Sequence, residues 1–218
     1  MLPRVISVDQ IRLSLARRPA VVFPKDGVRK AAVAMVLTEG KSGADVLFIE
    51  RARTVGDPWS GHMAFPGGRV DPTDADSRAA AERETLEEVG LSLAGAEQLG
   101  RLDDKRGNPR THPELVISAF VYHAKEPGEL AINHEVQDAF WFPLNGLVDR
   151  ARHVQYTAHG EFEFPGILVG EPDRHVVWGL TYSFLESFFV LLGSPLPDRW
   201  TEQMRSYARQ IEQGSRAD

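Results

Sequence analysis

The chain has 218 residues, of which 42% are hydrophobic and 26% are charged, a composition typical of a globular protein with a buried core rather than a disordered one. Its net charge of -6 argues against a dedicated nucleic-acid binder, which would carry a basic surplus. The absence of cysteine excludes disulfides, thiolate metal sites and cysteine nucleophiles.

The start of the chain shows no long apolar run followed by a small-residue cleavage site, so we expect no signal peptide. The apolar region 184–192 is interrupted by Glu186 and Ser187 and is too short to cross a bilayer. We therefore expect a cytoplasmic protein that binds neither membranes nor nucleic acid.

The first half of the chain predicts a helix, two strands and a long loop. A Ser-x-x-Gln capping box opens a helix over 7–16. Apolar runs at 31–37 and 46–49 predict strands, and the glycines between them predict a hairpin-like turn. Residues 51–68 predict a loop whose length is typical of a functional segment.

The remaining elements follow from the same signals. A helix is predicted from a cap at Asp76 or Ser77 to Val89, because Gly90 ends it. Residues 105–113 predict a polar loop, 180–192 an apolar helix buried in its own core or against a twin subunit in a homodimer, and 200–213 a final amphipathic helix. Strands are predicted at 98–102, 115–123, 139–142, 162–169 and 176–178. No repeat or linker interrupts the chain, so we expect one domain over 1–218, with a core at about 28–192 and helical additions at both ends.

The helix 77–89 concentrates acidic residues on one side. At 100° per residue, Glu84, Glu87 and Glu88 share one face, while Leu86 and Val89 lie opposite. We expect the carboxylates to face solvent and the two apolar side chains to face the core. Carboxylates gathered in this way repel one another unless a divalent cation lies between them.

The surroundings of these glutamates support a cation site. Arg83 precedes Glu87 by four residues, so the two are expected to pair along the helix. Ala80 and Ala81, one turn earlier, are expected to leave room for a phosphate group. The alternative is a solvated acidic face, but residues 71–88 hold seven acids against two arginines, which favours a cation.

The segment then matches a known pattern. Gly68 followed by Arg83-Glu84-Thr85-Leu86-Glu87-Glu88-Val89-Gly90-Leu91 resembles the signature of the Nudix hydrolases, with Thr85 in place of a usual aliphatic residue. Asp74 replaces the usual loop glutamate, and its spacing to Arg83 is one residue longer. The resemblance implies an α/β fold of the Nudix type, an α/β/α sandwich with a central mixed sheet.

A longer match, over 31–192, resembles the branch that contains coenzyme A pyrophosphatases. It rests on Phe65-Pro66-Gly67-Gly68, Asp71-Pro72 and Trp178-Gly179-Leu180-Thr181, with Arg51-Ala52 and Gly61 upstream. Asp57 stands near the place of an arginine in that branch's substrate-recognition segment. Nucleotide sugars, dinucleotides such as NADH and damaged nucleotides therefore remain alternatives to coenzyme A.

The resemblance implies attack of water on a phosphorus of a nucleoside diphosphate linked to another group, with Mg²⁺ or Mn²⁺. It implies metal ligation by Glu84, Glu87 and Glu88, with Arg83 orienting them, and Glu135 as the distal candidate for the general base. Candidate substrate contacts are Gly67, Gly68, Arg51, Arg69 and His62. Two other classes stay open, a nucleotide-sensing Nudix-like module without catalysis and a structural protein with an acidic surface helix; the intact glutamate trio favours the hydrolase.

Overall fold

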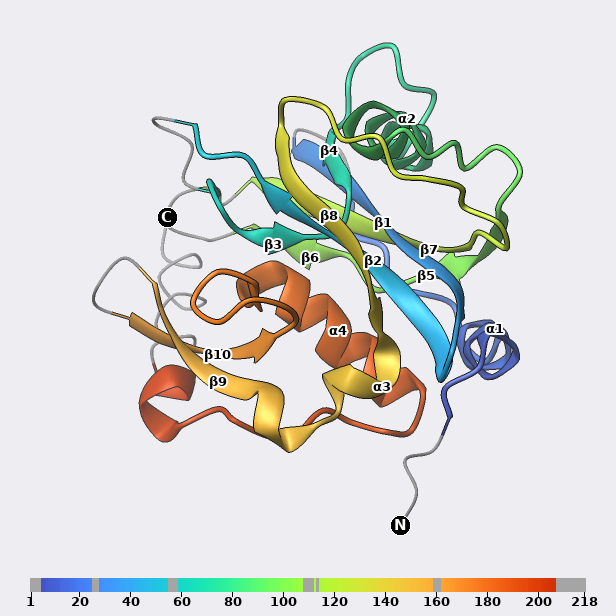
Figure 1. Cartoon of the computed structure of the whole chain (residues 1–218). Helices are drawn as coiled ribbons and strands as arrows, with labels where there is room; N and C mark the ends of the chain where they lie inside the picture. Colours follow the sequence, from blue (N-terminus) through green and yellow to red (C-terminus); the bar gives the residue numbers. More distant parts are fainter. Residues whose placement is uncertain are drawn as a thin grey trace.

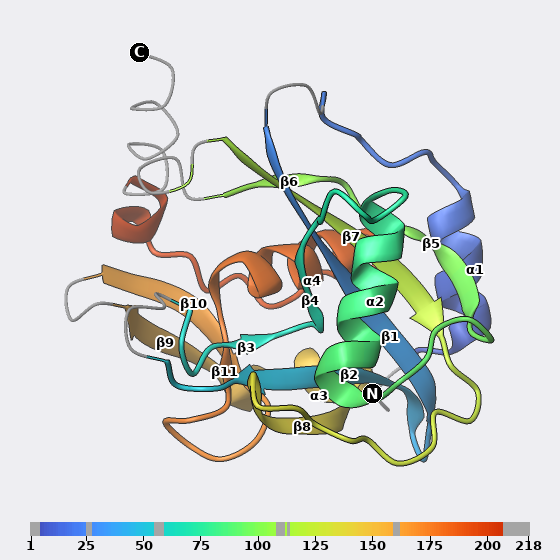
Figure 2. The same ribbon diagram turned by 90° about the horizontal axis from the view of Figure 1, so that it is seen from above.

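A central mixed sheet lies between helices in the computed structural model, which describes residues 5–24, 28–54, 59–107, 112, 114–158 and 162–206. Figure 1 shows α2 on one face of this sheet and α4 on the other, together with a second, smaller sheet. Figure 2 shows the same two helices on either side of β1 when the molecule is seen from above. The predicted α/β/α sandwich is confirmed.

The elements follow the chain in this order: α1 (Val8–Ala16), β1 (Arg29–Gly40), β2 (Gly43–Arg51), β3 (Met63–Ala64), β4 (Gly67–Arg69), α2 (Ser77–Val89), β5 (Glu97–Arg101), β6 (Lys105–Arg106), β7 (Leu115–His123), β8 (Val136–Pro143), α3 (Leu144–Leu147), a 3₁₀ turn (Arg150–Arg152), β9 (His153–Ala158), β10 (Phe162–Leu168), β11 (Val176–Val177) and α4 (Gly179–Leu191). The large sheet runs β3-β2-β1-β7-β5, with β4 on β1, β6 on β7 and β8 on β2. The sheet is mixed because β1 and β7 pair in parallel, whereas its other pairs are antiparallel.

The alternation of side chains along β1 divides the core into two layers. Met35 and Leu37 belong to the cluster on the α4 face, while Ala34 and Val36 belong to the cluster under α2. Because β1 is covered on both faces, its sequence reads as a continuous apolar run rather than an alternating one. This central strand is the support for both the α2 site and the cavity described below.

Most predicted elements are present, and the segments in which the structure differs from the prediction are short. The loop predicted at 51–68 contains β3 and β4, and the polar loop predicted at 105–113 begins with the short strand β6. Strand β9 was not predicted, although it pairs with β10 over six residue pairs. Of the predicted final helix 200–213, residues 202–206 are helical and 207–213 lie outside the described residues.

Helix α4 packs inside this chain. Its buried side chains are Tyr182, Phe184, Leu185, Phe188 and Phe189. These side chains join the core cluster on the α4 face of the sheet, so the apolar character predicted for 180–192 serves the chain's own core, and a homodimer stays a prediction. No helix within the described ranges combines the length and the apolar character needed to span a membrane.

Candidate active site

Helix α2 begins and ends where its capping residues require. The Asp76 side chain accepts a hydrogen bond from Ala79 N, 2.8 Å away, as the N-cap. Gly90 takes a left-handed conformation with φ of 70°, and its N–H donates to Leu86 O at 3.0 Å. Both predicted boundaries are confirmed, which fixes where each glutamate of the helix points.

The face of α2 that packs on the sheet differs from the predicted one. Ala80, Ala81 and Thr85 are fully buried against the sheet, whereas Leu86 is 51% exposed. The predictions that Leu86 faces the core and that the two alanines leave room for phosphate are therefore wrong. The small side chains let the helix approach the sheet closely, and the Thr85 hydroxyl donates to Ala81 O at 2.7 Å.

This rotation of the helix turns Glu88 inward. Glu88 is 1% exposed, and its Oε2 accepts a hydrogen bond from Gly67 N at 2.9 Å. The prediction that all three glutamates face solvent is thus wrong for Glu88, and Val89 is buried as predicted. A buried carboxylate held by one backbone N–H keeps acceptor capacity for a further partner.

The adjacent glycines of β4 make room for this arrangement. A Cβ at Gly68 would lie 2.4 Å from Glu84 Oε1, and a Cβ at Gly67 would lie 2.2 Å from Ala32 O. Gly67 also has φ of 149°, which side-chain-bearing residues rarely adopt. The pair is therefore required for the close approach of β4 to β1 on one side and to the Glu84 carboxylate on the other.

Arg83 connects the loop before α2 to the glutamates. Its Nε and Nη2 each donate to Asp74 at 3.0 Å, and its Nη1 donates to Glu84 and to Glu87, also at 3.0 Å. The predicted pair with Glu87 is confirmed. Asp74, whose role the sequence left open, is the main partner of the arginine, and the guanidinium lowers the pKa of the Asp74 carboxyl.

A third carboxylate reaches the two inner glutamates from a distant part of the chain. Glu84, Glu88 and Glu135 each offer an oxygen, and these oxygens lie within 4.8 Å of one another. The loop before β8 is held by Asn133 N donating to Glu88 O at 3.0 Å and by Ala52 N donating to Glu135 O at 2.8 Å. We call Glu84, Glu88 and Glu135 the carboxylate cluster; Glu87 lies beside it on Arg83, with its side chain half exposed.

The carboxylate cluster is short of positive charge. Burial raises the pKa of Glu88 to about 7, and the charges of Glu84 and Glu135 add to the rise, against the Gly67 N–H and Arg51. Burial also raises the pKa of Glu84. Arg51 Nη1 lies 3.9 Å from Glu88 Oε1. Three oxygen donors that converge beside a glycine strand suit a hard divalent cation such as Mg²⁺ or Mn²⁺.

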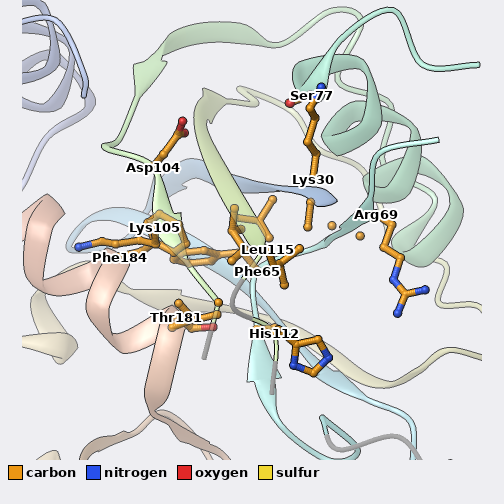
Figure 3. A pocket seen from close by; sticks show the side chains of 18 of the residues that line it. Lys30, Phe65, Arg69, Ser77, Asp104, Lys105, His112, Leu115, Thr181 and Phe184 are labelled. Carbon is orange, nitrogen blue, oxygen red and sulfur yellow. The ribbon is translucent and has the colours of Figure 1, made fainter. Parts of the chain in front are cut away.

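The cluster opens into one large cavity of about 2740 Å³. All the predicted substrate contacts line it: Arg51, His62, Gly67, Gly68 and Arg69. Figure 3 shows Lys30, Arg69 and Lys105 around the cavity, with Phe65 and Leu115 between them. Asp57 lies outside the described residues.

Several residues of this cavity were not predicted. Lys30 and Lys105 line it, although Lys30 only precedes a predicted strand and Lys105 opens the predicted polar loop 105–113. Trp178, at the end of the predicted strand 176–178, is half-buried in the cavity wall, where its ring stacks on that of Tyr156 with centroids 4.6 Å apart and meets the His62 ring at 4.7 Å. Trp178 carries a sequence signal, since it stands in the motif Trp178-Gly179-Leu180-Thr181, whereas Lys30 and Lys105 carry none and come together only through the pairing of the strands.

The sequence is similar to those of known proteins. The family model of the NUDIX domain matches residues 28–162. Human mitochondrial coenzyme A diphosphatase NUDT8 is 29% identical over 199 residues, covering 88% of this chain and 82% of that protein. The uncharacterized Nudix hydrolase NudL of Cronobacter sakazakii is 29% identical over 180 residues, covering 81% of this chain and 89% of that protein.

Two further comparisons concern a partial sequence match and a solved structure. The uncharacterized protein C14C4.10c of Schizosaccharomyces pombe is 41% identical over 108 residues, and the match covers 47% of this chain and 33% of that protein. The crystal structure of a NUDIX hydrolase from Alicyclobacillus acidocaldarius shares the fold, with a TM-score of 0.54 at 20% identity over 78% of this chain and 93% of that one. The fold, the glutamate helix and the family match together show that the chain belongs to the Nudix family of hydrolases.

Proposed function

We propose that this Nudix hydrolase cleaves the pyrophosphate bond of coenzyme A or its derivatives, with Mg²⁺ or Mn²⁺ as cofactor. The observation that carries the chemistry is the carboxylate cluster, whose three oxygens within 4.8 Å line the same cavity as the candidate substrate contacts. The observation that favours coenzyme A is the similarity to a coenzyme A diphosphatase over 88% of the chain.

Glu84, Glu87 and Glu88 are the proposed metal ligands; Glu84 and Glu88 belong to the carboxylate cluster, and Glu87 shares Arg83 with Glu84. A divalent cation bound there would supply positive charge to phosphate oxygens and lower the pKa of a bound water. Arg83 holds Glu84 and Glu87 in place, and Asp74 holds Arg83. Removal of either support is expected to misplace the ligands rather than to unfold the protein.

Glu135 is the proposed general base. Its side chain is the most exposed of the cluster, so it remains accessible to water where the buried Glu88 does not. In the proposed reaction the water oxygen bonds to one phosphorus, the bridging P–O bond breaks and Glu135 takes the water proton. Coenzyme A would then yield phosphopantetheine and adenosine 3′,5′-bisphosphate.

The cavity supports a large, anionic substrate. Its volume of about 2740 Å³ exceeds that of sites for drug-sized ligands, which span roughly 300–1,000 Å³. Lys30 and Arg69 supply cationic groups along its wall for phosphates that the metal does not reach, whereas the Lys105 ammonium donates to Ser187 of α4. Coenzyme A carries a diphosphate and a separate 3′-phosphate, which fits cations placed at several points.

Nucleotide sugars, NADH-like dinucleotides and modified nucleotides are the alternative substrates, because the arginine expected near Asp57 is absent. The test is incubation with a panel of diphosphate compounds and Mg²⁺ or Mn²⁺, with products identified by mass spectrometry. Phosphopantetheine and adenosine 3′,5′-bisphosphate from coenzyme A, at the highest kcat/KM of the panel, are expected. Faster cleavage of another class would replace coenzyme A, and cleavage of none would contradict the proposed activity.

A further inference from the structure

Two carboxylates face each other on neighbouring strands next to the active site. Glu50 of β2 pairs directly with Asp138 of β8 in the antiparallel register, and Glu50 is 1% exposed. Like charges directly opposite each other in a sheet destabilise the strand pair. Something must therefore compensate these two carboxylates if the ends of β2 and β8 are to stay together.

Arg174, in the segment between β10 and β11, provides that compensation. Its Nε and Nη2 lie 2.8 Å and 2.7 Å from Glu50 Oε2, and Nη2 lies 3.6 Å from Asp138 Oδ2. One guanidinium thus contacts both strands. Glu171 Oε2 accepts from Arg174 Nη1 at 3.1 Å, which anchors the arginine from its own segment.

His175 points at the same two carboxylates. Its Nε2 lies 3.4 Å from Glu50 Oε2 and 3.5 Å from Asp138 Oδ2, and its ring is nearly buried against Phe140. Its Nδ1 accepts the N–H of Glu171 at 3.0 Å, so the neutral ring carries its proton on Nε2. A proton on Nε2 disfavours metal ligation, although Glu50, Asp138 and His175 are close enough to surround an ion; Nε2 faces the two carboxylates without completing a hydrogen bond to either.

The position of these four residues links them to catalysis. The register between β2 and β8 shifts between Glu50 and Arg51, a bulge that re-aims the next side chain. Arg51 then lies 3.9 Å from Glu88, and Ala52 N holds Glu135 O at 2.8 Å. The strand ends that Arg174 joins are the ones that carry Arg51 and Glu135 to the carboxylate cluster.

We propose that Arg174, assisted by His175, is a positioning residue for hydrolysis: it neutralises the facing pair Glu50–Asp138 and so keeps Glu135 and Arg51 at the carboxylate cluster. The inference rests on the proposed function, because it assigns Glu135 to the reaction. Arg174 and His175 do not line the cavity formed by the described residues, so they act through the strands rather than on the substrate.

The test compares Arg174→Ala with Arg12→Ala. Arg12 also binds a carboxylate with two nitrogens, its Nε at 2.7 Å and its Nη2 at 2.8 Å from Glu97, and neither residue lines the cavity formed by the described residues. Arg174→Ala is expected to lower kcat roughly 10- to 100-fold, as loss of a supporting interaction does, with KM little changed and with weaker Mn²⁺ binding in a titration without substrate. Arg12→Ala is expected to leave all three values near wild type.

A second-site change separates positioning from general stability. In Arg174→Ala/Glu50→Gln one of the facing charges is gone, so most of kcat and of Mn²⁺ affinity is expected to return. His175→Gln, which keeps a side-chain donor, is expected to be closer to wild type than His175→Phe. No rescue by Glu50→Gln, or an Arg174→Ala loss that appears only in thermal stability, would overturn the proposal.

The outcomes for the proposed function stay distinguishable. If the wild type cleaves a diphosphate compound other than coenzyme A, the variants are assayed on that compound and only the substrate assignment fails. If the wild type cleaves none of the panel, the proposed function fails, and the positioning role fails with it. The titration can also show an Mn²⁺ site that is lost in His175→Phe and retained in Glu84→Gln. In that case the group formed by Glu50, Asp138, Arg174 and His175 binds a cation, and the positioning role is contradicted.

Discussion

At the scale of single residues, Glu88 couples folding to pH. Its folded-state pKa of about 7 lies above the ordinary value of 4.5, because burial disfavours the charged form. The folded state therefore holds this proton more tightly than the unfolded state. Without metal, the free energy of unfolding is expected to fall as pH rises from about 4.5 to about 7, on account of this group.

Urea unfolding in the presence of a chelator, at several values across that interval, measures the effect. Glu88→Gln keeps an acceptor for the Gly67 N–H and has no proton to lose, so its stability is expected to depend less on pH than that of the wild type. Mn²⁺ affinity of the wild type is expected to rise over the same interval, because the ion displaces the proton. A wild-type pH profile identical to that of Glu88→Gln would refute the assignment.

Gly68 offers a second residue-scale prediction. In Gly68→Ala the new Cβ would lie 2.4 Å from Glu84 Oε1, at the far end of a flexible side chain. The carboxylate is expected to move while the fold is kept, so turnover and Mn²⁺ affinity drop roughly 10- to 100-fold with a small change in Tm. Gly95→Ala, whose Cβ meets nothing within 4 Å, is the matched control. Equal kinetics for the two variants would contradict the role given to Gly68.

The sequence predicted the chemistry of these residues better than their orientation. The spacing of Arg83 and Glu87 predicted their ion pair, and the family pattern singled out Glu84, Glu87 and Glu88. The prediction of which face of α2 packs on the sheet was wrong. It relied on the hydrophobicity of Leu86, whereas the small side chains of Ala80 and Ala81 are the ones that pack on the sheet. Close packing of helix on sheet favours small residues, and a buried glutamate is recognisable only when its partner strand is known.

At the scale of elements, the junction between α2 and the loop before β8 connects the two halves of the site. Gly90 has φ of 70°, and a Cβ there would lie 2.9 Å from Ala131 Cβ. Ala131 N donates to Val89 O at 2.9 Å in the segment that leads to Glu135. A side chain added at Gly90 is therefore expected to displace Ala131 and, with it, the loop that carries the proposed base.

Gly128 supplies the control for this junction, because it has the same φ of 70° but open space around it. Both Gly90→Ala and Gly128→Ala incur the left-handed strain, so their difference isolates the contact with Ala131. Gly90→Ala is expected to lose about 1–3 kcal/mol more stability, the usual cost of overpacking, and also to lose turnover. Chemical denaturation and steady-state kinetics measure both; the same values in the two variants would count against the coupling.

The elements that the sequence predicted are those with a signal of their own. The apolar runs of β1, β2 and β7 and the capped helices α1 and α2 needed no partner to be recognised. Strands β3, β4 and β6 span only two or three residues, so they exist through their pairing with β2, β1 and β7. Their own residues carry no strand signal, unlike the equally short β11, whose two valines were predicted as part of the strand 176–178.

At the scale of the whole molecule, the site is assembled from segments far apart in the chain. Glu135 reaches α2 across more than forty residues, and the cavity joins the ends of β1, β4 and β6 to the start of α4. A local motif identified the helix that carries the glutamates, but no local motif specifies the shape of this cavity. Substrate choice is therefore the property that the sequence predicts least.

The most direct test of the central claim is the anomalous scattering of Mn²⁺ in crystals that also contain a non-cleavable coenzyme A analogue. The carboxylate cluster predicts a peak within bonding distance of Glu84 and Glu88, beside the diphosphate of the analogue and in reach of Glu135. A crystal in which those carboxylates hold no ion, while the analogue binds elsewhere, would contradict it.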